Sequence, residues 1–392
     1  MNTENGQSLF SKHHGHVSAE LRMIAEKVYN HIRISGEDAM QLYQSNNLGF
    51  LGELAHYVRV NRHGLNTYFN RNFHIEPTNI CIYTCSFCSF ARRPDEEGGW
   101  EYSLDEIEDL VRKYDGQAVT EVHIVGGVHP KRGVDYYGEM VQRIKRIRPE
   151  IHVKGFTAVE LKVMFARSRM SIEEGLAALK AYGLDSLPGG GAEIFHPDVR
   201  KEICDTKAST DNWLQIHEAA HRLGIPSNCT MLYGHVEKYE HRVHHMEQLR
   251  LLQDRTGGFN TFIPLKFRNE NNDLSHIRET NMIEDLKNYA VARIYMDNIA
   301  HIKAYWPMIG RDTTQISLSF GVDDIDGTID DTTKIYAMAG AEDKNPVMTT
   351  PGLIQLVREA GFRPIERDTL YNVIHDFGDK DFSESVDIPI LS

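Results

Sequence analysis

Short apolar runs alternate with longer amphipathic segments along most of this chain, and this alternation leaves few possible folds. Each run is long enough for one strand, and the segments between them carry apolar residues at helical spacing. Strands that alternate with helices form parallel sheets, because each helix returns the chain to the same end of the sheet. The eight strand-like runs are Asn72–Pro77, Thr120–Val125, Ile151–Phe156, Leu184–Leu187, Ser227–Tyr233, Asn260–Phe267, Ile302–Trp306 and Gln315–Phe320.

Helical patterns lie between most of these runs and also at both ends of the chain. Two helices begin with capping-box sequences, Ser103-Leu-Asp-Glu106 and Ser171-Ile-Glu-Glu174. The chain from Ser18 to about Asn70 has helical spacing, and another helix is expected near Thr350–Ala360. We therefore predict an α/β barrel over residues 72–327, with a helical N-terminal extension (1–71) and a short C-terminal extension (328–392). A doubly wound open sheet is the alternative, and both architectures place functional residues in the loops after the strands.

The composition excludes several classes of protein. The net charge of −13 over 392 residues disfavours binding to nucleic acid or to anionic lipid. No apolar stretch approaches the ~20 residues that a membrane-spanning helix needs. The N-terminal sequence lacks the basic and apolar regions of a signal peptide. We expect a cytoplasmic protein with no nucleic-acid partner and no membrane association.

Three of the five cysteines lie in one loop directly after the first predicted strand. Cys81, Cys85 and Cys88 have the spacing Cys-x3-Cys-x2-Cys. A structural zinc site needs four ligands, commonly in two separated pairs, whereas three thiolates on one loop suit an iron–sulfur cube with one iron left open. Of the other two cysteines, Cys229 lies in a strand and is expected to pack as a small apolar residue, and Cys204 has no evident role.

This cysteine spacing, with an aromatic residue before the last cysteine, resembles the signature of the radical S-adenosylmethionine (SAM) superfamily. The resemblance implies a barrel of the TIM type and a 4Fe-4S cluster held by Cys81, Cys85 and Cys88. It also implies that SAM chelates the open iron and is cleaved by an electron from the reduced cluster. An external electron donor such as flavodoxin or ferredoxin is then required.

The same resemblance implies where SAM binds. A Gly-Gly pair follows the second predicted strand, carboxylates follow the third and fourth, and the fifth resembles the element that packs beside adenine, although Thr230 stands where many relatives have glycine. The residues expected to contact SAM are Tyr83, Phe87, Gly126, Gly127, Glu160, Glu193, Thr230 and Glu237.

Further motifs narrow the resemblance to one group within the superfamily. His123–Pro130, Asp185–Glu193, Thr230–His235 and Gln253–Phe259 look like the group that contains the futalosine-pathway enzymes of menaquinone biosynthesis and the deazaflavin synthases. Within it, Thr157–Glu160, His301–Trp306 and Leu318–Thr328 look most like the aminodeoxyfutalosine synthases. These enzymes consume SAM as a co-substrate by adding its deoxyadenosyl radical to 3-[(1-carboxyvinyl)oxy]benzoate. The alternative is a relative that abstracts hydrogen, either the dehypoxanthine futalosine cyclase or a deazaflavin-synthase-like enzyme.

A substrate with two carboxylates needs cationic or polar partners at the barrel mouth. Four residues in predicted loops or strand ends are candidates for this role: His129, Arg242, Lys266 and Arg311. Because a radical must be kept from water, we also expect the terminal extensions to cover the mouth. No catalytic residue can be named from the sequence.

Two alternatives come from other classes of protein. An iron–sulfur electron carrier would need no barrel and would not turn over SAM. The helix from Ser209 contains His217-Glu-Ala-Ala-His221, which matches the His-Glu-x-x-His pattern of zinc hydrolases. No third metal ligand lies nearby in sequence, so we interpret these histidines as part of a solvated helix face.

Overall fold

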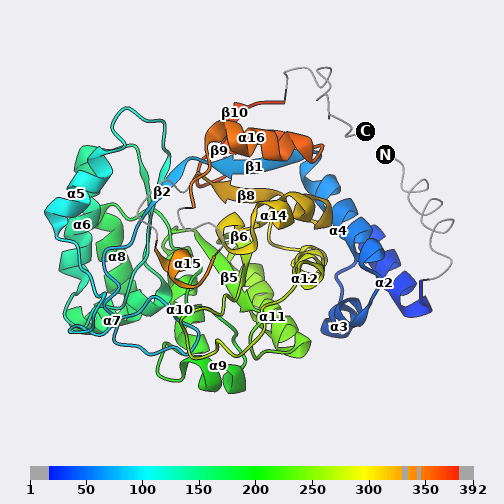
Figure 1. Cartoon of the computed structure of the whole chain (residues 1–392), viewed down its shortest axis with the longest axis horizontal. Helices are drawn as coiled ribbons and strands as arrows, with labels where there is room; N and C mark the ends of the chain where they lie inside the picture. The colour runs from blue at the N-terminus through cyan, green and yellow to red at the C-terminus, as the bar shows by residue number, and fades with distance from the viewer. Residues whose placement is uncertain (1–16, 329–333, 342–345, 379–392) are drawn as a thin grey trace, which may run out of the picture.

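Parallel strands surrounded by helices form the centre of the molecule (Figure 1). The computed structural model describes residues 17–328, 334–341 and 346–378. Strands β2 (Asn72–Ile75), β3 (Glu121–Ile124) and β4 (His152–Gly155) pair in parallel. Strands β5 (Ser227–Tyr233), β6 (Phe259–Lys266) and β7 (His301–Ile302) form a second parallel set. This arrangement confirms the predicted α/β class and its parallel strands.

Isolated backbone bridges join the two sets into one strand array. Ser186 bridges to Lys154 of β4, and the next residue, Leu187, bridges to Ser227 of β5. On the other side, Lys303 after β7 bridges to β8 (Asp324–Gly327), which pairs with β1 (Asn66–Asn70). Among the described residues, no backbone ladder joins β8 to β2. There the Thr328 hydroxyl accepts from the amide of Asn72 and donates to its carbonyl oxygen.

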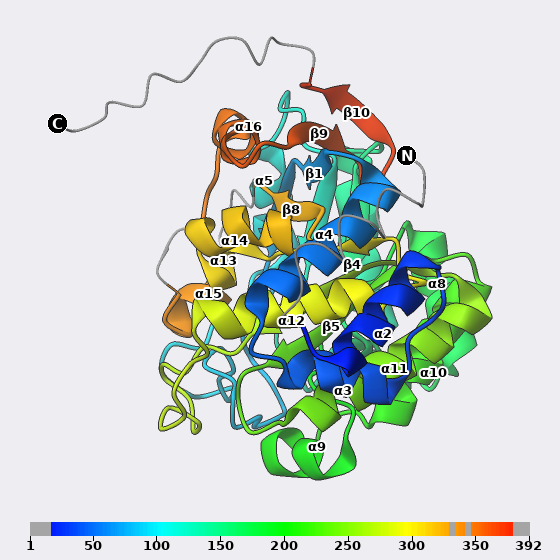
Figure 2. The same cartoon turned by 90° about the vertical axis from the view of Figure 1, so that its right-hand side faces the viewer.

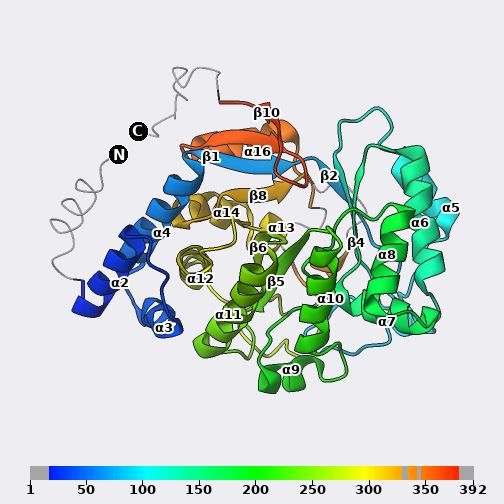
Figure 3. The same cartoon turned by 180° about the vertical axis from the view of Figure 1, so that it is seen from behind.

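Helices cover the outside of the strand array (Figures 1 and 3). Ser103 and Ser171 cap α5 and α8 through the predicted capping boxes. Among the described residues, no helix is long and apolar enough to cross a membrane. The covering helices are α5 (Leu104–Arg112), α6 (Val134–Ile147), α7 (Ala158–Ser168), α8 (Ile172–Tyr182), α9 (Pro197–Cys204), α10 (Thr210–Arg222), α11 (Tyr239–Thr256), α12 (Met282–Tyr295), α13 (Trp306–Ile309) and α14 (Arg311–Ser317).

The last strand of the array differs from the sequence prediction. Gln315–Phe320, expected to be a strand, belongs to α14 and a short 3-10 turn (Leu318–Phe320). The strand β8 follows it, with the sequence Asp324-Ile-Asp-Gly327, which has few apolar residues. Its carboxylates are buried beside Arg367 and Lys303, so ion pairing takes the place of the apolar pattern that predicts a strand.

The two terminal regions meet on one side of the array. Helices α3 (Gly36–Gln44) and α4 (Leu48–His63) pack against α11 and α12, and α2 (Ala19–Tyr29) packs on α3 and α4 (Figure 2). Residues 66–70, predicted as helix, form the strand β1, which pairs in parallel with β9 (Arg363–Arg367). The strand β10 (Val373–Asp376) extends this sheet, and the predicted C-terminal helix is α16 (Thr350–Glu359). Residues from both termini therefore extend the sheet that contains β8.

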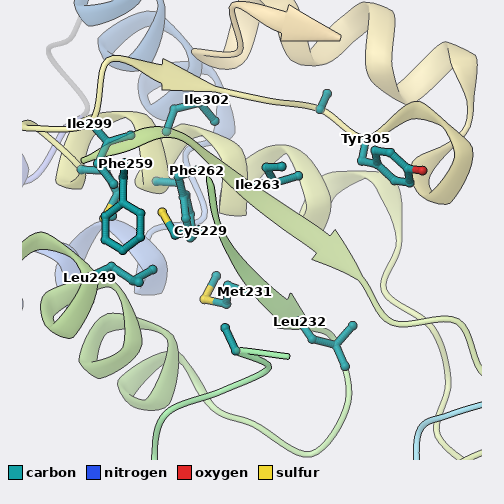
Figure 4. Packing of buried hydrophobic residues seen from close by; sticks show 14 of the residues in the cluster. Cys229, Met231, Leu232, Leu249, Phe259, Phe262, Ile263, Ile299, Ile302 and Tyr305 are labelled. Atoms are coloured by element: carbon teal, nitrogen blue, oxygen red, sulfur yellow. The ribbon is translucent and has the colours of Figure 1, made fainter. Parts of the chain in front are cut away.

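Side chains alternate between the two faces of the array, as the period of two in strands requires. On β6, Ile263 and Leu265 face a cavity inside the array. Figure 4 shows Cys229 of β5 packed among Phe262 of β6 and Leu249 of α11 on the outer side. Cys229 is fully buried there, as the prediction of a small apolar residue required. The inner face is therefore available to a ligand while the outer face forms the core.

Candidate functional site

A cavity of about 310 Å³ lies inside the strand array and opens among the loops that follow the strands. Its wall includes residues from β2 to β6 and from β8, and from the segments that follow the strands. The helix α15 (Ile335–Met338), in the predicted C-terminal extension, contributes Ile335 and Tyr336 to the same wall. The amides of Lys334 and Ile335 donate to the carboxylate of Glu76 at the end of β2, which ties this helix to the cavity.

The cysteine loop forms one side of the cavity, with Cys81, Cys85 and Cys88 in its wall. Backbone hydrogen bonds hold the loop: the amide of Cys81 donates to Arg92, and that of Ile82 donates to Val128. The amide of Tyr83 donates to the sulfur of Cys81 at 3.4 Å. Burial raises the pKa of the Cys85 thiol to about 12 and also raises the pKa of Cys81. A metal bound to these thiols would therefore displace their protons.

The Gly126-Gly127 pair packs directly on the backbone of the cysteine loop. A Cβ atom at Gly126 would lie 2.8 Å from the carbonyl oxygen of Thr78, and one at Gly127 would overlap the carbonyl of Ile80. The amide of Gly127 donates to the Thr78 carbonyl at 2.7 Å. Glycine is required at both positions because the two loops approach this closely. Both glycines also line the cavity.

Glu160 supports this wall from behind. Its carboxylate accepts hydrogen bonds from the amide and hydroxyl of Thr157, as in a capping box, and from the amide of Gly126. Burial raises the pKa of Glu160 to about 7, against the lowering effect of these donors. Glu160 is not among the residues of the cavity wall. Its carboxylate therefore positions the Gly126 loop.

Glu193 lies in the cavity wall and forms an ion pair with Lys207. Lys207, which follows α9, also lies in the wall, with its ammonium 5.2 Å from the centre of the Phe87 ring. Burial would lower the pKa of Lys207, but Glu193 together with Cys85 and Cys204 outweighs burial and raises the pKa. This lysine was missed in the sequence because no local motif surrounds it. Tyr83, Phe87 and Thr230 are in the same wall, so the structure brings most of the predicted SAM contacts together.

Glu237 lies apart from the cavity wall. Its carboxylate accepts from the amides of Gly234 and His235 and from the guanidinium of Arg242. Burial would raise the pKa of Glu237, but Arg242 and these donors lower it. Arg242 also pairs with Glu284, so both groups are committed to a buried network.

The other candidates for binding substrate carboxylates also lie outside the cavity wall. Lys266 is on the outer face of β6, where its ammonium is 2.9 Å from Asp285. His129 lies 3.4 Å from Glu101. Arg311 is exposed and lies over the Trp306 ring. The structure therefore places none of His129, Arg242, Lys266 and Arg311 where a ligand in this cavity would contact it.

A set of buried ionised residues occupies the inner end of the cavity, and the sequence analysis missed it. We call it the floor cluster because its members lie on the strands or, in the case of Lys303, directly after β7. Glu121 of β3 pairs with Lys154 of β4, and Lys303 pairs with Asp326 of β8. All four line the cavity. Asp324 and Arg367 complete the cluster as a third buried pair. Glu121, Lys154 and Lys303 lie within predicted strands and Asp326 does not, and no local motif marks these charges as one site.

The histidines of the His-Glu-x-x-His sequence are occupied by other contacts. His217 Nδ1 and His221 Nε2 each lie 2.8 Å from the hydroxyl of Ser227. His217 is fully buried and stacks on Trp213, so the predicted solvated face is wrong for this residue. Glu218 pairs instead with Arg222 and Arg255. These contacts form a structural network and leave no arrangement suited to zinc hydrolysis.

The donor set around the cavity fits an iron–sulfur cluster with an open iron. Three thiols line one wall, while Cys204 and Cys229 are buried away from it. The amide of Tyr83 already points at a cysteine sulfur, as donors do around such clusters. These thiols would hold the cluster, and the cavity beside them offers carboxylate, ammonium and backbone groups to SAM.

Comparisons with known proteins agree with this geometry. Family models described as "Radical SAM superfamily" and "CofH/MqnC C-terminal region" match residues 75–249 and 256–378. An aminodeoxyfutalosine synthase of Thermus thermophilus is 44% identical over 357 residues, which cover 90% of this chain and 95% of the relative.

Two further relatives have other names. A cyclic dehypoxanthine futalosine synthase of Streptomyces coelicolor is 37% identical over 91% of this chain and 90% of its own. A 5-amino-6-(D-ribitylamino)uracil–L-tyrosine 4-hydroxyphenyl transferase of Methanopyrus kandleri is 37% identical over 82% of this chain and 88% of its own.

Among solved structures, the hydrogenase maturase HydG of Carboxydothermus hydrogenoformans superposes with a TM-score of 0.71 at 17% identity, covering 94% of this chain and 84% of that one. This likeness shows the shared fold. The cofactors of the superfamily are a 4Fe-4S cluster and SAM. By the two family matches and the identity to these relatives, the chain belongs to the radical SAM superfamily, in the group with the CofH/MqnC C-terminal region.

Proposed function

We propose that this chain is an aminodeoxyfutalosine synthase of menaquinone biosynthesis. It would join the 5′-deoxyadenosyl group of SAM to the vinyl carbon of 3-[(1-carboxyvinyl)oxy]benzoate and give aminodeoxyfutalosine, methionine and bicarbonate. The observation that carries the proposal is the 44% identity to the Thermus thermophilus enzyme of that name over nearly the whole of both chains.

The wall of the cavity supports a division of roles among the residues of this chain. Cys81, Cys85 and Cys88 would hold the cluster, and the Gly126-Gly127 loop would keep the cysteine loop in position. When bound, the reduced cluster supplies the electron that cleaves SAM into methionine and a 5′-deoxyadenosyl radical. Glu193, Thr230, Tyr83 and Phe87 line the same space and would contact SAM.

The helix α15 supports the exclusion of water that radical chemistry needs. Ile335 and Tyr336 lie in the cavity wall, and Tyr305 stacks at a tilt on Tyr336 with 5.0 Å between ring centres. Tyr305 belongs to the His301–Trp306 segment that resembles the synthases. An external donor such as flavodoxin or ferredoxin would supply the electron.

The second candidate is a relative that abstracts hydrogen, and the 37% identity to a cyclic dehypoxanthine futalosine synthase favours keeping it. The fate of the adenosyl group separates the two. In the synthase the adenosyl group leaves inside the product, whereas hydrogen abstraction releases 5′-deoxyadenosine or returns it to SAM.

The test is anaerobic turnover with reductant, the enolpyruvyl benzoate and SAM labelled in its adenosyl portion. We expect the label in the nucleoside product, with free deoxyadenosine only as a minor side product. Label in the methyl group should leave entirely with methionine, which would exclude methyl transfer. If 5′-deoxyadenosine accumulates one-for-one with product, the synthase proposal is wrong and the cyclase becomes the proposed function.

A further inference from the structure

The floor cluster differs from the usual interior of a parallel barrel, which is filled by branched apolar side chains. His123 and Lys154 lie directly side by side on β3 and β4, in the register of the two strands. Lys303 follows β7, and Asp326 lies in β8. Each of these four residues reaches the cavity. A ligand that fills the cavity would therefore meet ionised groups at its inner end.

The carboxylates of the cluster hold the lysines in place. The ammonium of Lys154 lies 2.6 Å from Glu121, which also accepts from the hydroxyl of Thr369. The ammonium of Lys303 lies 2.8 Å from Asp326. Arg367 takes up Asp324 with two hydrogen bonds, of 2.6 and 2.9 Å, to one oxygen. Three cations and three carboxylates thus balance before any ligand enters.

Stability alone gives little reason for these pairs. A buried ion pair loses about as much free energy by desolvation as it gains by attraction, and apolar side chains of similar size commonly replace it without loss. The lysines can also donate further hydrogen bonds, because each ammonium group has three N–H donors. Among the described residues, Lys154 and Lys303 each donate one side-chain hydrogen bond, and Lys303 also lies 3.7 Å from Asp324.

His123 adds a neutral donor or acceptor at the same level. Its Nε2 atom is buried with no hydrogen-bond partner in the described part of the chain. Burial, helped by His74 and Lys154, lowers the pKa of His123 well below its ordinary value, so the ring is neutral. Lys303 is close enough to lower the pKa of Lys154, after the larger effect of burial. Two ammonium groups and an imidazole are therefore gathered around one end of the cavity.

We propose that Lys154, Lys303 and His123 bind a carboxylate of the aromatic substrate at the inner end of the cavity, opposite the cysteine loop. Glu121 and Asp326 act as positioning residues that keep the two ammonium groups in the wall. The identity of the substrate rests on the proposed function, but the chemistry recognised is that of an aromatic carboxylate.

The experiment measures binding by calorimetry to the full chain with its cluster reconstituted. The probes are isophthalate, which is a dianion of suitable shape, and benzamide, which is neutral. Charge-neutral pairs of substitutions avoid leaving an unpaired buried charge: Lys303→Met with Asp326→Asn, and Lys154→Met with Glu121→Gln. Lys266→Met with Asp285→Asn is the matched control, a buried lysine–aspartate pair on the outer face of β6.

We call these two double variants the floor-pair variants. We expect each to bind isophthalate about 10- to 100-fold more weakly than the wild-type chain, because charge-assisted hydrogen bonds are lost. Binding of benzamide should be unchanged, because benzamide carries no carboxylate. Unchanged isophthalate affinity in both floor-pair variants would overturn the inference. An equal loss in the Lys266 control would also overturn it.

The outcome for the substrate separates this inference from the proposed function. Suppose that the wild-type chain makes no aminodeoxyfutalosine, but both floor-pair variants bind isophthalate more weakly than wild type. The carboxylate site is then supported and the proposed function is wrong. If the wild-type chain makes the product while the floor-pair variants bind the enolpyruvyl benzoate as tightly as before, the proposed function stands and the carboxylate site is wrong.

Discussion

The two ends of the cavity are built in different ways. At the mouth, the cysteine loop and the Gly126-Gly127 loop are held by backbone hydrogen bonds and by contacts that only glycine permits. At the floor, side chains from β3, β4 and β8 are held by pairing between opposite charges. Each loop of the mouth therefore carries a short motif that the sequence shows, whereas the floor residues belong to no local motif and are defined by their charged partners.

This difference has consequences for what a substitution does. A change at the mouth alters the position or chemistry of the ligands but removes little buried surface. A change at the floor leaves a buried charge without its partner, which costs folding free energy. Substitutions at the mouth should therefore cause loss of cofactor with an intact fold, and substitutions at the floor should cause loss of stability.

The largest effect is expected from the cysteines of the mouth. Cys→Ser at Cys81, Cys85 or Cys88 should remove the cluster and turnover together, because the described part of the wall holds no fourth thiol. Iron content and the visible absorption of anaerobically prepared protein measure this. Cys204→Ser and Cys229→Ser are the controls and should keep both cluster and activity. A fully loaded cluster in the Cys85→Ser chain would show that the ligand set is wrong.

At the floor, Arg367→Met should lower the free energy of unfolding by about 3–5 kcal/mol, because Asp324 remains buried without its main partner. Denaturant unfolding measures this change. Adding Asp324→Asn should restore most of the loss, since both charges are then gone. If the single and double variants were equally unstable, packing of the arginine and not its charge would hold β8 to β9.

A smaller effect, on SAM binding, is expected from the charged residue Glu193 near the mouth. Glu193→Gln should weaken SAM binding by about 1–3 kcal/mol if its carboxylate bonds the cofactor. Equilibrium binding of SAM to the reconstituted chain measures it. Glu237→Gln is a matched control, because this buried glutamate lies outside the cavity wall and should affect stability alone. Equal SAM affinity in the wild-type and Glu193→Gln chains would make Glu193 a structural partner of Lys207.

The same difference decides what could be predicted from the sequence. The parallel class, most strands, the capping boxes and the cysteine loop follow from local patterns, and the structure contains them. The strand β8 and the floor cluster could not be found in this way. Asp324 and Asp326 resemble loop residues until Arg367 and Lys303 are brought beside them, and that depends on chain contacts 43 and 23 positions away.

The candidates for binding substrate carboxylates lie outside the cavity wall for a related reason. Lys266 lies at the end of β6, but its side chain is on the outer face and pairs with Asp285. Arg242 lies on α11, outside the strand array, and pairs with Glu284. The inner-facing Lys154 and Lys303 lie within predicted strands, where no loop motif marks them. The face of the strand, and not its end, decides which lysines meet a ligand.

The smallest effect on stability is expected at Glu160. This residue combines the features of the two ends, because its buried carboxylate holds the backbone of the Gly126 loop. Its pKa of about 7 lies above the ordinary 4.5, so the folded chain keeps a proton that the unfolded chain releases between these values. The stability that this proton contributes is complete below pH 4.5 and is lost as the pH rises through 7. Glu160→Gln cannot ionise and should lack this dependence.

The difference in free energy of unfolding between wild type and Glu160→Gln should therefore shift by roughly 1–2 kcal/mol from pH 5 to pH 8, against the wild type, since each pKa unit is worth about 1.4 kcal/mol and relaxation reduces the full amount. Denaturant unfolding at a series of pH values measures it, and other titrating groups cancel in the difference. A difference independent of pH would mean that Glu160 ionises normally. The Gly126 loop would then be held by an ordinary carboxylate, and the mouth would depend on its backbone alone.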